Sequence, residues 1–114
     1  MKITTASAVF LLSIMLCVAP GHGASPTLID TGQQVFDYWC AACHGSGMDM
    51  AGTQALAAKY NGALPASLEE RTDLTPEIIR LFVRQGIKVM PNFRKTEISD
   101  TDLEALAAYL TRSK

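Results

Sequence analysis

The sequence of 114 residues predicts an all-α fold, and three observations support this prediction. Apolar residues recur at helical spacing in three separate stretches, near residues 28–39, 76–85 and 103–110. The alternating apolar and polar pattern of a half-buried strand does not occur, and there is no internal repeat. The length allows only one hydrophobic core, so we expect one small helical domain.

The first 24 residues have the composition of a secretory signal peptide. Lys2 precedes an uncharged, apolar run from Ala8 to Ala19, and proline and glycine follow that run directly. The run is shorter than the roughly 20 residues that a helix needs to cross a bilayer, which favours a cleaved signal over a retained anchor. We therefore expect residues 1–24 to be removed on export to the periplasm. Residues 25–114 would then form the mature domain, without a membrane span.

The charge of the chain excludes some classes of partner. The sequence has ten Lys and Arg residues against eleven Asp and Glu residues, a net charge of −1, and loss of Lys2 with the signal would make it −2. Such a mixed balance of charges gives no basic surface for binding nucleic acid.

A mature domain of this size buries only roughly 60–65% of its unfolded surface, so we expect a cofactor, a disulfide or a partner to complete its core.

The first predicted helix runs from Leu28 into Cys40. Its apolar face carries Val35, Phe36 and Trp39 at helical spacing. Gly32 lies on the same face, although glycine costs a helix about 1 kcal/mol relative to alanine. Its place there favours close contact with another helix.

The middle of the chain is less regular. Residues 45–52 have the composition of a flexible loop, and a short helix is expected at about residues 54–60, where Asn61 and Gly62 would end it. Residues 64–74 are expected to form a loop with one turn of helix.

The two remaining helices have clear local signals. Thr75 suits an N-cap, Pro76 the first helical position and Gly86 the residue beyond the C-terminus, which predicts a helix over residues 76–85. Its apolar stripe is too wide for a surface helix, so we expect it to be packed on two sides. Ser99 has an acidic residue three positions on, as in a capping box, ahead of a terminal helix that we expect to pack on the first helix.

Residues 40–44 read Cys-Ala-Ala-Cys-His, a C-x-x-C-H run. Two thiols one helical turn apart can each add to a vinyl group of haem, and the next residue then presents its imidazole to the iron. The spacing therefore predicts one covalently attached haem c, held by Cys40 and Cys43, with His44 as an iron ligand.

Other uses of these cysteines fit less well. A zinc site needs a second pair of ligands, and residues 25–114 contain no further Cys or His. A thioredoxin-like site needs a βαβ context that the helical pattern does not supply. A disulfide between Cys40 and Cys43 stays open as the alternative, because export would place the pair in an oxidising compartment.

The sixth iron ligand must come from elsewhere in the chain. His44 is the only histidine beyond residue 24, so the candidates are methionine, lysine or none. Met48 lies only four residues on, a reach of at most about 14 Å, and would have to loop around the haem rim. Met90 lies in an irregular segment that Pro91 stiffens. We therefore predict Met90 as the sixth ligand, with Met50 and an empty or lysine-filled site as alternatives.

Two further groups of residues allow more than one interpretation. Trp39 and Tyr60 could line a haem pocket, or they could be ordinary core aromatics. Basic residues lie near the Met90 segment. The first interpretation is that they form a solvated surface, and the alternative is that they pair with haem propionates or bind a partner protein. These residues are Arg80, Arg84, Lys88, Arg94 and Lys95.

Two segments resemble the class I cytochrome c family: TGQQVFDYWCAACHG at residues 31–45 and VMPNFRKTEISDTDLEALAAYL at residues 89–110. The resemblance implies a small fold of helices wrapped around one covalent haem. It also implies that Gly32 and Phe36 meet the terminal helix near Leu106 and Tyr109. The family usually has a proline shortly after the haem-binding histidine whose carbonyl accepts the histidine Nδ1–H. None occurs here before Pro65, so we expect another carbonyl of residues 45–52 to serve.

More narrowly, LTPEIIRLFVRQGIKVMPNF at residues 74–93 is similar to the cytochrome subunits of p-cresol methylhydroxylase-type flavocytochromes. The resemblance implies that a flavin dehydrogenase acting on 4-alkylphenols passes electrons to the haem. The sequence thus predicts a carrier of single electrons that is not itself an enzyme. The alternatives are a freely diffusing carrier to a terminal oxidase, a haem protein that binds ligands at an open sixth site, and a disulfide exchange protein.

Overall fold

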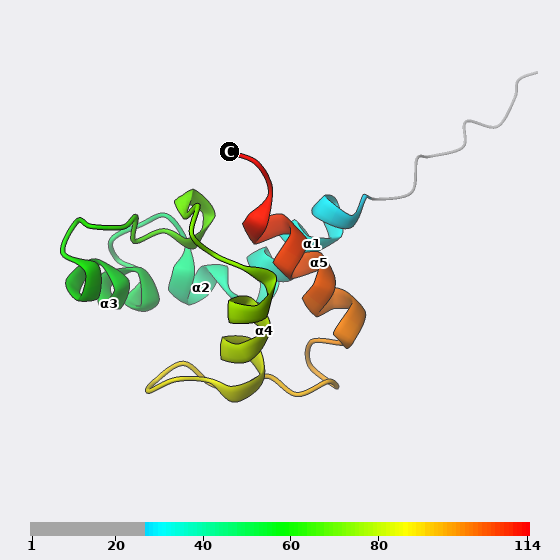
Figure 1. The fold of residues 1–114 in the computed structure, drawn as a ribbon. Helices are drawn as coiled ribbons and strands as arrows, with labels where there is room; N and C mark the ends of the chain where they lie inside the picture. Colours follow the sequence, from blue (N-terminus) through cyan, green and yellow to red (C-terminus); the bar gives the residue numbers. More distant parts are fainter. Residues whose placement is uncertain (1–26) are drawn as a thin grey trace, which may run out of the picture.

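The computed structural model describes residues 27–114, so the expected signal peptide lies outside the described residues (Figure 1). The elements follow one another as α1 (Leu28–Trp39), α2 (Ala41–His44), α3 (Ala51–Tyr60), a short 3₁₀ helix (Leu68–Glu70), α4 (Pro76–Gln85) and α5 (Asp100–Thr111). The described part of the chain contains no strand beyond one isolated bridge between Ile87 and Met90. The predicted all-α fold is confirmed. Within residues 27–114, no helix combines the length and the apolar character that crossing a membrane requires.

Helix α1 begins at a complete capping box. The Thr27 side chain accepts from the backbone N–H of Asp30 at 3.1 Å, and the Asp30 carboxylate accepts from the Thr27 backbone N–H at 3.0 Å. Val35 and Phe36 are buried, as the apolar spacing predicts. Leu28 is 55% exposed, because the helix begins at that residue, before it reaches the core.

Helices α1 and α5 pack side by side, and Figure 1 shows them together. A Cβ atom on Gly32 would lie 2.0 Å from the Ala105 carbonyl oxygen and 2.6 Å from Cβ of Tyr109. The predicted close contact at Gly32 is therefore confirmed. The rings of Phe36 and Tyr109 lie 5.8 Å apart, and Leu106 is fully buried beside them. This agrees with the contact that the family resemblance implies.

Helix α4 has the ends that its sequence predicts. The Thr75 hydroxyl accepts from the Ile78 backbone N–H at 3.3 Å, Pro76 opens the helix, and Gly86 follows it with φ of +67°. Ile79 and Val83 are buried in the core, where α4 meets α5. The other apolar side of α4 faces a cavity.

Helix α3 begins earlier than expected, at Ala51 rather than near Gln54. It ends where predicted, with Asn61 in the left-handed conformation at φ of +46°. Thr53 is the buried residue of this helix, which packs on α2 and lies at the far side of the molecule from α5 (Figure 1).

The segment between α3 and α4 is an irregular chain with one 3₁₀ turn, as expected. Two side-chain contacts join it to the C-terminal end of the chain. The Tyr109 hydroxyl donates to the Glu69 carboxylate, and the Lys114 ammonium donates to the Arg71 carbonyl. The C-terminal residues therefore hold this segment against α5.

Candidate functional site

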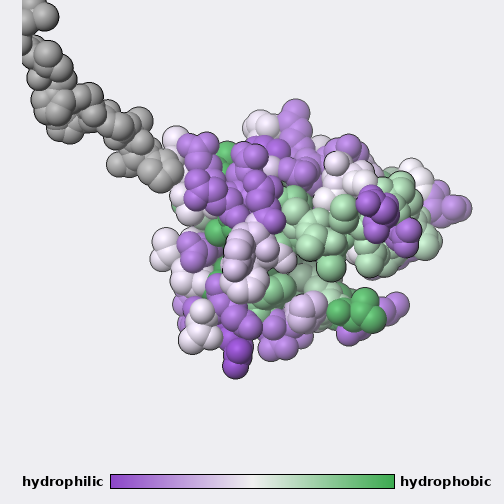
Figure 2. Space-filling view, turned by 180° about the vertical axis from the view of Figure 1, so that it is seen from behind, coloured by the Kyte–Doolittle hydropathy of each residue, from purple (hydrophilic) through white to green (hydrophobic). Residues whose placement is uncertain are grey.

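A cavity of about 640 Å³ lies between α2, α3, α4 and the segment that follows α4. Its wall is mainly apolar, and in the space-filling view pale green hydrophobic surface lies in the hollow between two lobes (Figure 2). Its size falls within the range of small-molecule and cofactor sites, roughly 300–1,000 Å³. The side of α4 that does not face the core contributes Ile78, Leu81 and Phe82 to this wall.

The cavity brings together all four residues that the sequence singles out. Cys40, Cys43 and His44 reach it from the end of α1 and from α2, and Met90 reaches it from the segment after α4. These residues are separated by up to 50 positions in the chain, so their convergence on one cavity is a result of the fold.

The two cysteines lie where α1 meets α2. Cys40 is the C-cap of α1 and also the N-cap of α2, which contains Cys43. Both are free thiols. Burial, with a smaller contribution from the neighbouring Cys43, raises the pKa of Cys40 to about 12. Because thiol exchange needs a thiolate, this environment does not favour Cys40 as the attacking thiol of a disulfide exchange protein.

His44 closes α2, with its ring at the cavity wall. Burial lowers the pKa of His44, which favours the neutral imidazole that can bind a metal. The ring Nδ1 is buried and has no hydrogen-bond partner among the described residues. The expectation that a carbonyl of residues 45–52 accepts from this nitrogen is therefore wrong in this structure.

Met90 lies in a tight turn that backbone hydrogen bonds close. The Ile87 N–H donates to the Met90 carbonyl at 3.1 Å, and the Met90 N–H donates to the Ile87 carbonyl at 2.9 Å. The chain passes so close to Gly86 that a Cβ atom there would lie 2.6 Å from the Met90 carbonyl oxygen. Glycine is thus required at that position by both its positive φ and its neighbours.

The other methionines near the C-x-x-C-H run are not part of the cavity wall. Met48 is 59% exposed, and Met50 packs against the loop near Gly45. Of the three methionines in the described residues, only Met90 lines the cavity. The arrangement favours Met90 over Met50 as a group that could bind a metal inside it.

Aromatic residues line part of the wall. Trp39 and Phe93 both reach the cavity, and their rings meet edge to face with centroids 5.8 Å apart. Tyr60 also lines the cavity, from the end of α3. Of the two interpretations that the sequence left open for Trp39 and Tyr60, the structure favours the pocket.

A polar corner of the cavity was not predicted from the sequence. The Arg71 guanidinium lies 4.6 Å from the centre of the Tyr60 ring, and its Nε donates to the Asp73 carboxylate at 2.8 Å. Arg71 is 5% exposed. The hydrogen bond from Arg71 holds the pKa of Asp73 below its usual value. No local pattern indicates this burial, because the ring that covers Arg71 belongs to another segment.

The basic residues near Met90 are mostly paired on the surface. Arg80 donates to Glu104, Arg84 and Lys95 to Asp100, and Arg94 to Glu97. Lys88 is the member of the group whose side chain lines the cavity. Most of these basic residues therefore form a solvated surface, which was the first of the two interpretations.

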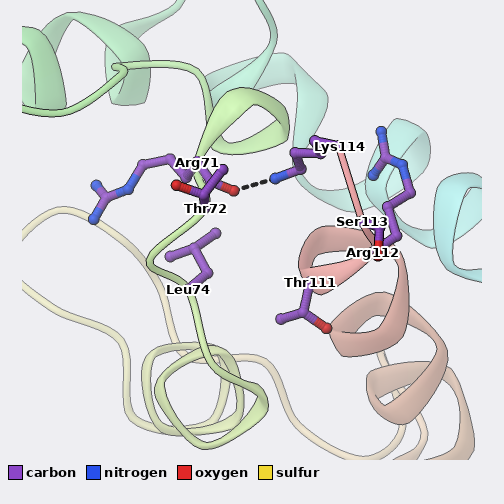
Figure 3. Close-up of a pocket in the computed structure, with 7 residues that line it drawn as sticks. All are labelled: Arg71, Thr72, Leu74, Thr111, Arg112, Ser113 and Lys114. Carbon is purple, nitrogen blue, oxygen red and sulfur yellow. Dashed lines mark hydrogen bonds between the residues drawn. The ribbon is translucent and has the colours of Figure 1, made fainter.

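A second, smaller pocket of about 320 Å³ lies between residues 71–74 and the C-terminal end of α5 (Figure 3). Although Arg71, Arg112 and Lys114 line it, the side chains of Arg71 and Arg112 point away from its centre in Figure 3. The Lys114 ammonium donates hydrogen bonds to the Arg71 and Leu110 carbonyls. This pocket therefore lacks the converging charges of an anion site.

The large cavity fits a covalently attached haem. Two free thiols lie one helical turn apart at its edge, the His44 imidazole lines it beside them, and a thioether reaches it from a separate segment. The apolar wall suits a porphyrin face. Residues that could hold the haem are thus present in this chain.

A comparison with protein families supports the same chemistry. The family model described as "Cytochrome C oxidase, cbb3-type, subunit III" matches residues 27–110, which cover α1 and reach almost to the end of α5. A search of curated proteins gave no match.

Proposed function

The chain belongs to the family of cbb3-type cytochrome c oxidase subunit III domains, and from this premise we propose that it is an exported carrier of single electrons with one haem bound by Cys40, Cys43, His44 and Met90. Membership makes the chain a class I c-type cytochrome, a haem-based electron carrier with covalent haem c. This fits an electron carrier rather than a catalytic enzyme.

The observation that carries the proposal is the apolar cavity that all four residues line. When bound there, haem supplies the one-electron Fe(III)/Fe(II) couple: an electron is accepted from one partner and passed to another, with no bond made or broken in the chain. The residues of the chain have separate roles. The cysteines would anchor the haem, His44 and Met90 would bind its iron, and the wall from α4 would exclude water.

Replacement of Met90 tests the ligand assignment. A soft thioether favours the ferrous state, so Met90→Ala should lower the reduction potential and open the iron to carbon monoxide. The wild-type oxidised protein should show the weak near-infrared band of sulfur bound to ferric iron, and the variant should lose it. Absorption spectra and potentiometric titration measure all three.

Met50→Ala is the matched control, since Met50 lies near the same loop but does not line the cavity. It should leave the band and the potential unchanged. If Met50→Ala removed the band and Met90→Ala did not, the ligand assignment would be wrong, though the haem proposal would stand. If wild-type protein bound carbon monoxide readily, a ligand-binding haem protein would replace the electron carrier.

The redox partner is proposed only by class. An electron-transfer cytochrome implies a partner protein, and the sequence resemblance points to a flavin dehydrogenase acting on 4-alkylphenols. The family match does not support that narrower resemblance, and a carrier to a terminal oxidase is the alternative. Copurification from the native source separates them: a flavin-containing dehydrogenase supports the first, and an oxidase complex supports the second.

Export to the periplasm rests on the pattern of residues 1–24 alone. The purified native protein should therefore begin near residue 25 and appear in the periplasmic fraction. Intact-mass measurement with haem included checks both the cleavage and the number of haems. A mass that retains residues 1–24 would contradict the signal peptide, and a mass without haem would contradict the main proposal.

A further inference from the structure

The first turn of α3 packs against one edge of the His44 ring. A Cβ atom built on Gly52 would lie 2.7 Å from the Cys43 carbonyl oxygen, 2.7 Å from Cε1 of His44 and 2.8 Å from Nδ1 of His44. Side-chain carbons do not approach other atoms this closely, so only glycine allows the turn to close on the imidazole and on the Cys43 backbone. The edge of His44 that carries Nδ1 therefore rests on the backbone of Gly52.

The residue after Gly52 fastens this turn to the chain next to His44. Thr53 is 1% exposed, and its hydroxyl donates to the Gly45 carbonyl at 2.6 Å. Gly45 follows His44 directly, so the bond joins the end of α2 to the start of α3. A buried threonine hydroxyl without this partner would be costly, which makes the bond a strong local restraint.

Hydrogen bonds within the intervening loop occupy several other carbonyls. The Gly47 carbonyl accepts from the Met50 N–H at 3.1 Å, and the Met48 carbonyl accepts from the Gln54 side chain at 2.7 Å. The Met50 carbonyl accepts from the Gln54 N–H at 2.9 Å. None of these carbonyls pairs with Nδ1 of His44. On this edge of the ring, packing against Gly52 takes the place of a hydrogen bond.

We propose that Gly52 and Thr53 are positioning residues for His44, in which Gly52 is a flat wall for the ring and Thr53 holds that wall in place. The proposal rests on the proposed function, since His44 matters here as the iron ligand. It assigns to the start of α3 the orienting role that a proline carbonyl plays in the family that the sequence resembles. Groups around a metal ligand fix its orientation and tune the metal.

Thr53→Val tests the proposal in the full-length, haem-loaded protein. Valine has nearly the shape of threonine but cannot donate to the Gly45 carbonyl, so the wall should loosen and the imidazole should turn. The spread of the g values in the electron paramagnetic resonance spectrum of the ferric protein should change. The midpoint potential should also shift from the wild-type value, because the groups that hold a metal ligand in place tune the metal.

Two matched variants separate positioning from general stability. Thr53→Ser keeps the hydroxyl and should retain the wild-type spectrum and potential. Gln54→Ala removes a hydrogen bond of the same loop that does not hold the His44 ring, so it should leave both unchanged. If Thr53→Val lowered only the unfolding midpoint, with spectrum and potential unchanged, Thr53 would have a structural role and the proposal would be overturned. The same holds if Gln54→Ala shifted the potential as much as Thr53→Val.

The wild-type protein provides a test that needs no variant. In the reduced, diamagnetic state, nuclear magnetic resonance should show a nuclear Overhauser contact between the Gly52 α-protons and the His44 ring proton on Cε1. Absence of this contact in a protein with covalent haem would overturn the proposal and leave the proposed function intact. Absence of covalent haem would instead contradict the proposed function itself.

Discussion

The paired helices α1 and α5 and the cavity-lining half of the molecule use apolar residues in different ways. Phe36 and Leu106, in the helix pair, are each 1% exposed. On the cavity side, Leu81 and Ile87, which both line the cavity, are 46% and 47% exposed. The difference shows that the helix pair is completed by protein contacts, whereas the other half forms a wall that needs something else to cover it.

The unequal burial of these two regions explains why one small chain can depend on a cofactor. The helix pair supplies most of the buried core, and α4 adds Ile79 and Val83 to it. Helix α3 packs mainly on α2 and lines the cavity, with Thr53 as its buried residue. The cavity half therefore gains the most from a bound porphyrin, because its apolar wall has no partner within the described residues.

Removal of the haem should have the largest effect. Cys40→Ala together with Cys43→Ala should leave no covalent haem, and the mature protein should be largely unfolded, because its small core is completed by the porphyrin. Circular dichroism during heating, with a haem stain on a denaturing gel, measures both. A cooperative transition with native-like helix content in haem-free protein would contradict the comparison.

Gly32→Ala should have the next largest effect, because it separates the helix pair. Alanine favours a helix by about 1 kcal/mol, but overpacking costs typically 1–3 kcal/mol, and a Cβ atom 2.0 Å from the Ala105 carbonyl lies at the costly end. We expect a net loss of about 2 kcal/mol in the free energy of unfolding, measured by urea denaturation. Gln33→Ala, at an exposed position of α1, is the control and should change this free energy by less than about 0.5 kcal/mol. Equal stabilities of the two variants would contradict the close packing.

A smaller effect should distinguish two leucines of similar exposure. Leu81 lines the cavity and Leu28 does not, although they are 46% and 55% exposed. If haem covers the cavity wall, Leu81→Ala should lower the free energy of unfolding of the haem protein by at least about 1 kcal/mol. Leu28→Ala should change it by less than about 0.5 kcal/mol. Equal losses in urea titrations would mean that the cavity wall stays open to water.

The smallest effect should come from the ion pair that joins α4 to α5. Arg80 donates to Glu104 at 2.6 Å, and this hydrogen bond lowers the pKa of Glu104 from its ordinary value of 4.5. A carboxylate with a lowered pKa in the folded state adds stability above pH 4.5, and that stability is lost as the pH falls through its folded pKa. Glu104→Gln should therefore lower the thermal midpoint slightly at pH 7, and this difference should shrink as the pH falls below 4.5. Because the pair is exposed, added salt should also reduce the difference.

The parts of the fold that local chemistry decides could be predicted from the sequence. Thr75, Pro76 and Gly86 give the bounds of α4, and Gly32 identifies the helix that approaches α5. The start of α3 was missed because Met50 at its N-cap makes no side-chain capping bond, so no local signal marks that position.

Part of the site could also be predicted, because some of its residues form a local pattern. The spacing of Cys40, Cys43 and His44 is local, and the structure brings Met90 to the same cavity. The burial of Arg71 beneath Tyr60 could not be predicted, since it depends on how two distant segments meet. The unpaired Nδ1 of His44 likewise depends on how the loop uses its own carbonyls.

The closed turn at Met90 has a consequence for the speed of electron exchange. Two backbone hydrogen bonds between Ile87 and Met90 and the close approach at Gly86 leave the turn few ways to move. With the proposed ligand in so stiff a turn, the sulfur would keep its place when the iron gains or loses an electron. Little nuclear rearrangement would then accompany each transfer, because one position of the ligand would serve both oxidation states. With Met90 as the proposed ligand, a turn built this way would favour rapid self-exchange between oxidised and reduced molecules.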